Sequence, residues 1–546
     1  MRMPRPSSGI PAEHPPAPID INAYLARFDW HPEPELVGYR DEGASRAALE
    51  DLGNATWRAA LEFLYGTAVQ RAMGDPAPYA DLRNSYFGSG KGPSAAPESP
   101  TPYAAILGEF ASRISGGLMN AQHPRQFGYF TPPPLPISIM GELLAQMANQ
   151  GVDVWHAGPV AAFVEEEVVR WLCDMVGYDA GSFGLLTSGG VMANFMGMAL
   201  ARDVHLGRLV GAGRPPRGAL LEGARVYTSD QTHFSIARSL DELGFPPETH
   251  VVIASDDRFR LRGDAVAEAV ARDRAGGLVP FAVAAVAGST NTGSVDAVDE
   301  LADVAAAEDL WLHVDAAYGG AARLSQRDAG RVPDLERANS VTVDPHKWFF
   351  QAYDIGGLVV RDGHHLGVTF GGRSPEYYRG GETSGPGTAG DPGADPGDGH
   401  GNGDQQLNFY KLSFEGTRRW RALKLWMSWK HLGTKGFGRL IEANVDLAAH
   451  LARRCAEADD FEAIPEAPEL SVVCFRHLAP GLDGKALDAH QDALQAALER
   501  SGDGWLTTTR LRGATWLRAG IVNYLSTEDD IDQLLLTLRS LAGEID

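Results

Sequence analysis

The sequence predicts an α/β protein. From about residue 139 onward, short apolar segments alternate with segments of helical spacing. The apolar segments RVYTS, HVVIAS, FAVAAVAG and LWLHVDA have the length of strands, and helical segments such as ADVAAAEDL lie between them. Strands that alternate with helices form crossover units, so we expect a mainly parallel sheet that is covered on both faces.

With 546 residues, the chain is long enough for two or three domains. Residues 1–20 are rich in proline and predict a disordered tail, and residues 21–138 have a mostly helical pattern that ends in FGYFTPPPLP. We expect the large α/β domain over residues 139–415 and a smaller α+β domain over residues 416–546. In the smaller domain, SVVCFRH and TWLRAGIV predict strands, and STEDDIDQLLLTLRSLA predicts a capped terminal helix.

One segment of the large domain has almost no apolar residues. It reads TSGPGTAGDPGADPGDGHGNGDQ and lies within about residues 371–406. Such a segment cannot bury enough apolar surface to offset the entropy that is lost when its backbone is ordered. We therefore expect a mobile loop with a glycine-rich insertion there.

Composition excludes several classes of partner. The chain has 48 basic and 71 acidic residues, a net charge of -23, which disfavours binding to nucleic acid or anionic lipid. The three cysteines, Cys173, Cys455 and Cys474, have no metal-type spacing and are too few for a disulfide framework. The segment MRMPRPSSGIPAEHPPAP lacks the apolar stretch of a secretory signal, and no apolar run in the sequence is long enough for a membrane span. We expect a cytoplasmic protein without a metal site.

Two segments carry candidate chemistry. Lys347 lies in the apolar and aromatic segment SVTVDPHKWFF, where burial favours the neutral amine that can attack a carbonyl. The alternative is a lysine whose stem covers apolar surface while its ammonium reaches water. Asp315 follows the apolar strand LWLHVD and would lie at the carboxyl end of that strand, where α/β sheets bind ligands. Its carboxylate would suit a cofactor with a pyridine nitrogen, although an aspartate there can also cap a helix.

Two weaker signals accompany them. The turn TSGGVMAN, residues 187–194, leads from a strand into a helix, whose first amides can bind a phosphate. Many turns of this kind carry glycine for geometry alone. His233, in SDQTHFSIARS, precedes a helix, and a lone histidine of this kind is more often structural than catalytic.

Together these segments resemble one family. The motifs SDQTH, GSTNTGSVD, HVDAAYGG and DPHKW are similar, in this order, to those of the group II pyridoxal-phosphate decarboxylases, which act on aromatic amino acids, glutamate or histidine. The resemblance runs from about residue 100 to the C-terminus, apart from the glycine-rich insertion. It implies the fold-type I architecture of aspartate aminotransferase, pyridoxal 5'-phosphate as cofactor and a homodimer with its active site at the interface. Residues 21–138 would then form a dimerisation arm.

The resemblance also implies a role for each matching residue. Lys347 would hold the cofactor as a Schiff base, and Asp315 would pair with the pyridine nitrogen. His233 would stack on one ring face, Ala317 would pack on the other, and Thr290 would lie near the ring hydroxyl. The further cofactor contacts that the resemblance implies are Gly189, Gly190, Val191, Asp344 and His346.

Two of these positions depart from the family pattern. Many relatives have serine where this chain has Val191, so a hydroxyl donor to the phosphate is missing there. Some relatives have asparagine where this chain has Asp344. Both departures bear on the phosphate contacts.

The resemblance implies decarboxylation of an amino acid. In the family, a loop tyrosine from the neighbouring subunit returns a proton to the carbon that lost carbon dioxide. Tyr377, in SPEYYRGG, matches that tyrosine, and Tyr378 is the second candidate, although either could be an ordinary loop aromatic. Relatives that make aldehydes often change this tyrosine or the histidine at 233. Because this chain changes neither, decarboxylation is favoured over aldehyde synthesis. Other carbanion chemistry on an amino acid, such as cleavage of a carbon–sulfur or carbon–carbon bond, is the further alternative, and a non-catalytic binding protein is the least favoured.

The substrate is assigned less sharply. The segment FGYFTPPPLP resembles the substrate-lining strip of the family, with Phe127, Tyr129 and Phe130 as candidate walls, and Trp155 could line the same pocket. Aromatic walls suit an aromatic or bulky side chain. Because this strip also lies near the dimer contact in relatives, the same aromatics could serve interface packing. We expect an aromatic or bulky L-amino acid, ahead of acidic or diamino ones.

Overall fold

A computed structural model of the chain describes residues 42–65, 71–72, 77–99, 101–212, 216–371 and 406–545. Two compact units make up the chain, residues 1–120 and residues 121–546. The expected disordered tail and nearly all of the expected mobile loop lie outside the described residues.

The regular structure that is described in the first unit is helical. It consists of α2 (Glu42–Tyr65), α3 (Tyr79–Phe87) and α4 (Tyr103–Glu109), which continues through a short π-helical turn. The hydroxyl groups of Thr56 and Tyr103 lie 2.7 Å apart and join α2 to α4. The rings of Phe63 and Phe110 meet edge to face at 6.3 Å.

The division between the units falls after residue 120, whereas the sequence pattern placed a boundary at residue 138. Backbone hydrogen bonds fasten the intervening segment to the larger unit. Phe127 donates its amide to the carbonyl of Trp505 at 2.9 Å, and Leu135 donates to the carbonyl of Phe350 at 2.9 Å. The proline-rich strip is therefore part of the larger unit, although it has little regular structure of its own.

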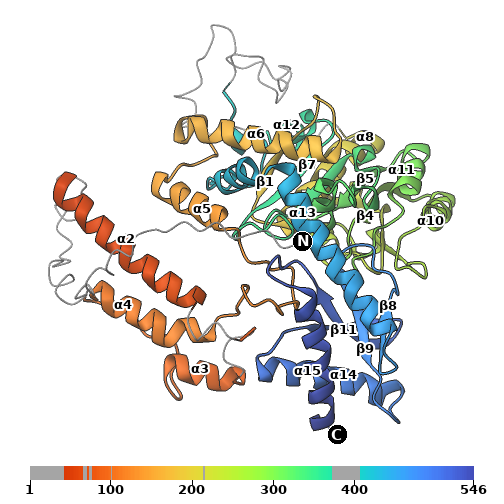
Figure 1. Ribbon diagram of the computed structural model, residues 1–546. Helices are drawn as coiled ribbons and strands as arrows, with labels where there is room; N and C mark the ends of the chain where they lie inside the picture. The colour runs from red at the N-terminus through yellow and green to blue at the C-terminus, as the bar shows by residue number, and fades with distance from the viewer. Residues whose placement is uncertain are drawn as a thin grey trace. The chain divides into compact units, whose positions relative to one another are not determined.

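The larger unit is built on a seven-stranded sheet with the strand order β1-β7-β6-β5-β4-β2-β3 (Figure 1). Four of its six strand pairings are parallel, and β7 runs antiparallel to both of its neighbours. Every residue of β1, β5, β6 and β7 is buried, so both faces of the sheet are covered there. The mainly parallel α/β fold that the alternating pattern predicted is confirmed. The strands are β1 (Phe183–Thr187), β2 (Ala224–Ser229), β3 (His250–Ile253), β4 (Val279–Val286), β5 (Trp311–Asp315), β6 (Ser340–Val343) and β7 (Gly356–Val360).

Helices that flank the apolar strands in sequence pack against the sheet. α6 contacts β1 and β7, and α10 and α11 contact β4. α6 does so because its buried residues recur at helical spacing along one side. The helices of this region are α5 (Pro136–Ala148), α6 (Pro159–Val176), α7 (Gly190–Leu200), α8 (Gly207–Leu209), α9 (Ser235–Glu242), α10 (Gly263–Ala275), α11 (Val298–Ala307) and α12 (His364–Phe370).

A smaller antiparallel sheet has the order β10-β11-β9-β8. Its strands are β8 (Phe461–Ile464), β9 (Val472–His477), β10 (Thr507–Leu511) and β11 (Ala514–Gly520), and α14 (Gly484–Ser501) and α15 (Glu528–Ile545) accompany it. α15 begins as its sequence predicted, because Thr527 and Asp530 cap each other through side chain and backbone. This sheet has its own apolar core, separate from the core around the large sheet.

The long α13 (Ala422–Ala456) packs against α5 and α6 and also against β8 and β9. It breaks at Gly433, whose φ of 62° is accessible to glycine and strained for other residues. Within the described part of the chain, no helix, α13 included, combines the length and the apolar character that a bilayer crossing needs.

Candidate active site

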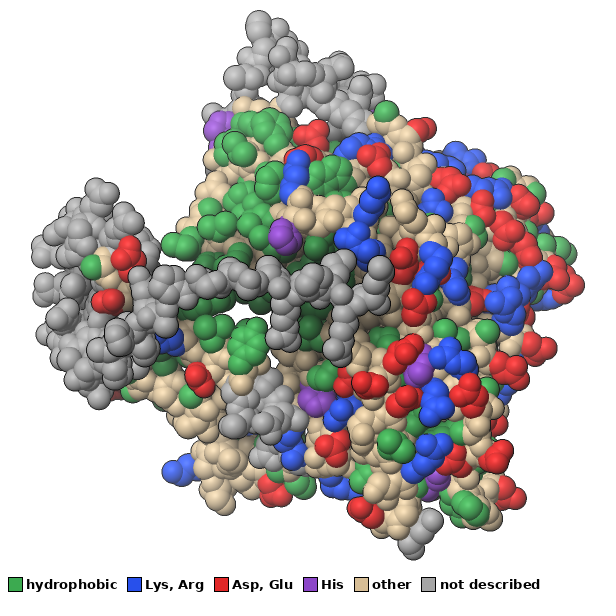
Figure 2. All heavy atoms as spheres, in the orientation of Figure 1, with side chains coloured by type: hydrophobic (Ala, Val, Ile, Leu, Met, Phe, Trp, Pro, Cys, Tyr) green, Lys and Arg blue, Asp and Glu red, His purple; other side chains and the backbone are tan. Residues whose placement is uncertain are grey.

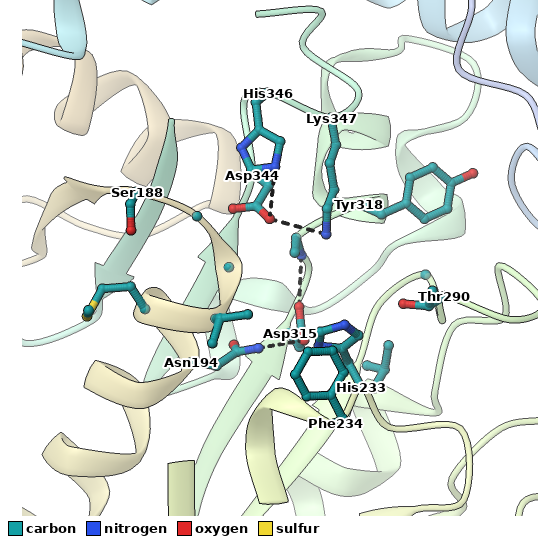
Figure 3. A pocket seen from close by; sticks show the side chains of 17 residues that line it. Ser188, Asn194, His233, Phe234, Thr290, Asp315, Tyr318, Asp344, His346 and Lys347 are labelled. Atoms are coloured by element: carbon teal, nitrogen blue, oxygen red, sulfur yellow. Dashed lines mark hydrogen bonds and ion pairs between the residues drawn. The ribbon is translucent and has the colours of Figure 1, made fainter. Parts of the chain in front are cut away.

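A cavity of about 400 Å³ opens where β4, β5 and β6 end and α7 begins (Figure 3). This is the carboxyl edge of the parallel strands, where α/β sheets place their ligands. The structure brings together around this cavity all ten residues that the sequence proposed as cofactor contacts. They are Lys347, Asp315, Ala317, His233, Thr290, Gly189, Gly190, Val191, Asp344 and His346.

Asp315 is the last residue of β5, and its side chain is held by two donors. The backbone amide of Ala317 donates to Oδ1 at 3.1 Å, and the side-chain amide of Asn194 donates to Oδ2 at 2.7 Å. The residue is only 6% exposed, so its carboxylate faces the cavity with little competition from water. Two hydrogen bonds to one buried carboxylate fix its direction.

Lys347 lies in the turn that follows β6. Its amide donates to the carbonyl of Asp344, and its Nζ lies 3.2 Å from Oδ2 of the same aspartate. Next to it, Nδ1 of His346 lies 2.6 Å from the carbonyl oxygen of Ile355, and burial lowers the pKa of His346 below its ordinary value. Lys347 and Asp344 lie at one end of the cavity and Asp315, Asn194 and His233 at the other, with the amine directed between them (Figure 3).

His233 forms part of the cavity wall beside Asp315. Its Nδ1 lies 2.9 Å from Oγ of Ser235, and the backbone amide of Ser235 also points to Nδ1, at 3.3 Å. Burial lowers the pKa of His233, and the charge of Asp315 opposes that shift. A neutral, flat ring in this position can pack against an aromatic cofactor without the cost of burying a charge.

The first turn of α7 forms the anion-binding end of the cavity. Three amides at the start of an α-helix have no partner within the helix, and the helix dipole favours negative charge there. The backbone must approach closely, because a Cβ on Gly190 would lie 2.7 Å from Oδ2 of Asp344. As the sequence indicated, Val191 has no hydroxyl that could donate to a phosphate. Ser188 lines the same cavity and does have a hydroxyl.

Asp344 is an unusual residue for the anion-binding end of the cavity, because it places a second carboxylate there. Its Oδ1 is buried and has no hydrogen-bond partner among the described residues, while Oδ2 faces Lys347. A buried acceptor that is left unpaired costs free energy unless a ligand or a proton satisfies it. Apart from Asp344, the cavity combines the amine of Lys347, a helix N-terminus and the buried carboxylate of Asp315, which fit the aldehyde, the phosphate and the ring nitrogen of pyridoxal phosphate in chemical type.

The sequence argument missed seven residues that line the cavity, which are Ser188, Met192, Asn194, Phe234, Val286, Gly288 and Tyr318. Each lies inside or beside a motif that had already been singled out. Asn194 closes TSGGVMAN, and Tyr318 belongs to HVDAAYGG. A helical spacing of four residues from Gly190 to Asn194 was the available signal, because it places both on one side of α7.

The structure does not place the four proposed substrate residues on the cavity wall of this chain. Phe127 is fully buried in the core of the smaller sheet. Tyr129 is exposed against the ring of Trp505, and Trp155 packs against Phe163. Tyr377 and Tyr378 lie outside the described residues.

Phe130 is the residue of the 127–130 strip that contacts a side chain of the cavity wall. Its ring stacks on Tyr318 at 4.0 Å between centroids, and Tyr318 lines the cavity. The buried side chain of Arg518 joins this strip to the residues at the rim of the cavity. Nε of Arg518 donates to the carbonyl of Thr290 at 2.6 Å, and Nη1 donates to the carbonyl of Gly128 at 2.9 Å.

Comparison with known proteins decides the family. The pyridoxal-dependent decarboxylase conserved domain matches residues 89–385 and 399–478. The chain belongs to this family. An aromatic-L-amino-acid decarboxylase from Bacillus atrophaeus is 31% identical, with 82% of this chain and 87% of that protein covered. An L-2,4-diaminobutyrate decarboxylase from Rhizobium meliloti is also 31% identical, with 82% of this chain and 84% of that protein covered.

A solved structure agrees with this assignment. The glutamate decarboxylase domain of a diaminobutyrate-pyruvate transaminase and L-2,4-diaminobutyrate decarboxylase from Vibrio parahaemolyticus matches with a TM-score of 0.76 at 26% identity. The match covers 91% of this chain and 96% of that one. The decarboxylase is therefore a fold-type I enzyme whose cofactor is pyridoxal phosphate, and its reaction is the decarboxylation of an amino acid.

Proposed function

We propose that this decarboxylase converts an L-amino acid with an aromatic or other bulky side chain into its amine and carbon dioxide, with Lys347, Asp315, His233 and Tyr377 as its catalytic residues. The observation that carries the proposal is the placement of Lys347 and Asp315 at opposite ends of one cavity, with the ring of His233 on the wall beside Asp315. A lysine amine and a buried carboxylate in this arrangement suit the two ends of one cofactor ring.

Bound pyridoxal phosphate supplies the electron sink that takes up the electron pair when carbon dioxide leaves. The residues of this chain do the rest. Asp315, fixed by two hydrogen bonds, keeps negative charge at the ring-nitrogen end of the cavity. Lys347 provides the amine for covalent attachment, and the amides at the start of α7 hold the phosphate. We assign the return of a proton to the reacting carbon to the phenol of Tyr377, with Tyr378 as the alternative.

The aromatic side chains near the rim support an aromatic substrate. The stack of Phe130 on Tyr318 continues an apolar surface from the cavity wall into the 127–130 strip. Within the described lining, Asp315 and Asp344 are the carboxylates, and each has a place in the cofactor site. A diamino substrate would need a further acidic partner for its second ammonium, and the described lining offers none.

We also propose a homodimer in the cytoplasm. Hydrophobic side chains gather over α5 and α6 (Figure 2). Exposed apolar surface of this extent marks an interface, and two-fold symmetry is the commonest way to cover it. The three cysteines are free and buried, which agrees with a reducing compartment. The exposed side chains are Leu143 (52%), Leu144 (50%), Met147 (62%), Val160 (69%) and Phe163 (53%).

A substrate panel tests the chemistry. The protein saturated with pyridoxal phosphate is mixed with L-phenylalanine, L-tyrosine, L-tryptophan, L-2,4-diaminobutyrate and L-glutamate, and amine and carbon dioxide are quantified by mass spectrometry. We expect amine from one or more aromatic substrates, in equal amount to carbon dioxide. Amine from diaminobutyrate alone would contradict the substrate class but leave the decarboxylase intact.

The same panel tests the alternative reaction, in which an aldehyde, ammonia and hydrogen peroxide are formed with oxygen. Retention of both His233 and Tyr377 argues against it. Tyr377→Phe should suppress amine formation strongly, and Tyr378→Phe should do so weakly. Light scattering during dilution tests the dimer, since a fully active monomer would contradict a shared active site.

A further inference from the structure

A row of buried polar side chains lies behind Asp315, outside the cavity. His313 precedes Asp315 by two residues on β5, so both side chains point to the same face of the sheet. The ring of His313 is fully buried. Its Nδ1 lies 2.8 Å from Oγ of Ser340, and its Nε2 lies 2.9 Å from Oδ1 of Asn194. The indole of Trp311 donates to the same Oγ of Ser340 at 3.0 Å.

These contacts define where each proton lies. The carboxylate of Asp315 can only accept, so the nitrogen of Asn194 faces it and the oxygen of Asn194 faces Nε2 of His313, which must donate. Nδ1 of His313 is then the acceptor for the hydroxyl proton of Ser340, whose oxygen accepts from the indole of Trp311. Burial lowers the pKa of His313 to about 4, so the ring is neutral at physiological pH and carries its single proton on Nε2. That proton is donated to Oδ1 of Asn194.

His313 and Thr342 therefore fix the orientation of the Asn194 side-chain amide. Its Oδ1 accepts from His313 and also from the hydroxyl of Thr342 at 2.7 Å. The nitrogen must face the other way, where it donates to Oδ2 of Asp315 at 2.7 Å. The reverse orientation would bring the amide oxygen against a carboxylate oxygen, so both ends of the side chain agree on one orientation.

Asn194 also reaches the wall residue of the cavity. Its second N–H donates to Oγ of Ser235 at 2.8 Å. Ser235 then gives its hydroxyl proton to Nδ1 of His233 at 2.9 Å, which leaves the proton of the neutral ring on Nε2. One amide thus contacts the carboxylate at the ring-nitrogen end (Figure 3) and, through Ser235, the histidine of the wall.

The backbone of α7 is shaped for this contact. A Cβ on Gly197 would lie 2.6 Å from Cε1 of His313, so only glycine lets the helix lie directly over that ring. Asn194 is three residues earlier, on the same side of α7. The close approach places its amide between β5 and α9.

We propose that Asn194 is a positioning residue that couples Asp315 to His233, so that one buried amide fixes both the carboxylate opposite the cofactor ring nitrogen and the tautomer of the stacking imidazole. This inference rests on the proposed function, because it takes the cavity as the cofactor site. Asn194 acts through Asp315 and Ser235 and has no reacting atom of its own.

The test separates a ring-nitrogen effect from general damage. Dissociation constants are measured for pyridoxal phosphate and for an analogue in which carbon replaces the ring nitrogen, with wild type, Asn194→Ala, Asp315→Asn and Thr342→Val. Thr342→Val is the matched control, because it removes one donor to Asn194 and leaves the contact with His313. We expect Asn194→Ala to bind pyridoxal phosphate about tenfold more weakly, the size of one hydrogen bond to a charged group, and to bind the analogue as wild type does.

The His233 branch has a separate readout. Ser235→Ala leaves the contact between Asn194 and Asp315 in place, so its affinity for pyridoxal phosphate should stay within about threefold of wild type while kcat falls. Thr342→Val should leave both ligands within about threefold of wild type. An equal loss of both ligands in Asn194→Ala, or no loss of either, would overturn the coupling.

A second pair of variants covers the case in which Asn194→Ala does not fold. Gln at 313 can still donate to Asn194 and accept from Ser340, whereas Phe cannot. His313→Gln should keep the preference for pyridoxal phosphate over the carbon analogue, and His313→Phe should lose it. If the two variants had the same preference for pyridoxal phosphate over the carbon analogue, the role of His313 in orienting Asn194 would be refuted.

The wild type and Asp315→Asn separate the two levels of inference. If the wild type does not attach pyridoxal phosphate to Lys347, the proposed function fails. If the wild type prefers pyridoxal phosphate over the analogue and Asp315→Asn abolishes that preference, the cofactor site stands. Retention of the preference in Asn194→Ala would then defeat the coupling alone.

Discussion

Nζ of Lys347 lies 3.2 Å from Oδ2 of Asp344, three residues earlier in the turn that follows β6. The pair is mostly buried, with the lysine side chain 23% exposed and the aspartate side chain 2% exposed. The carboxylate of Asp344 thus holds the amine of Lys347 beside the cavity, where the amine can react with a carbonyl compound.

Borohydride reduction should label Lys347 and spare Lys424. Lys424 is the natural control, because its side chain is fully buried and burial lowers its pKa to about 7, so part of it is the neutral, nucleophilic amine. It pairs with Glu142 and lies outside the cavity lining. Peptide mass spectrometry after reduction of the yellow protein should find the label on residue 347. Lys347→Ala should abolish the visible absorbance, and label on Lys424 instead would contradict the assignment.

Asp344→Asn should tighten binding of pyridoxal phosphate. A Cβ on Gly190 would touch Oδ2 of Asp344, so this carboxylate lies against the first turn of α7, where the phosphate is expected. Asparagine removes the like charge and adds a donor for the phosphate, which we expect to improve affinity by about tenfold. Fluorescence titration of the cofactor-free protein measures the change. Weaker binding would show that the charge of Asp344 is needed to hold Lys347 in place.

His313 should make the protein less stable in acid. Its pKa is about 4 in the folded protein, against an ordinary value of 6.5, because burial outweighs the opposing charge of Asp315. The unfolded chain therefore binds a proton that the folded chain refuses, and stability falls as the pH drops from about 6.5 to about 4. The loss is roughly 3 kcal/mol, at about 1.4 kcal/mol for each pH unit.

Urea unfolding at pH 7 and at pH 4.5 measures this loss. His313→Gln should flatten the difference between the two pH values, while His156→Gln, at an exposed position, should leave it unchanged. An unchanged acid sensitivity in His313→Gln would show that other groups cause it.

Arg418→Met should destabilise the larger unit. Arg418 and Glu165 form an ion pair in which both side chains are at most 1% exposed, and Arg418 also donates to the carbonyl of Val152 at 2.8 Å. Removal of one partner leaves a buried charge, at a cost of about 3–5 kcal/mol. Arg208→Met is the matched control, since the pair of Arg208 with Asp309 is 56% exposed on both sides and should cost less than about 1 kcal/mol. Thermal unfolding measures both losses, and equal unfolding temperatures of Arg418→Met and Arg208→Met would contradict this prediction.

Local pattern was sufficient for much of the fold. The strands around β5 and the helix α15 were predictable, because apolar runs and cap residues act on their own neighbours in sequence. The division after residue 120 was not. The segment that follows it has little regular structure, and its attachment depends on carbonyl groups of Trp505 and Phe350 that are hundreds of residues away.

The same distinction between local pattern and long-range contact applies to the site. The sequence by itself determined the chemistry of the cavity, since Lys347, Asp315 and the glycine turn lie in motifs whose residue types can be read locally. Only the tertiary structure decided what holds them, because Asn194 meets His313 and Asp315 through contacts between α7 and β5 that no local pattern encodes. It also decided that Phe127 is a core residue in this chain. A side chain's type shows what it can donate or accept, but burial and direction arise only when distant segments pack together.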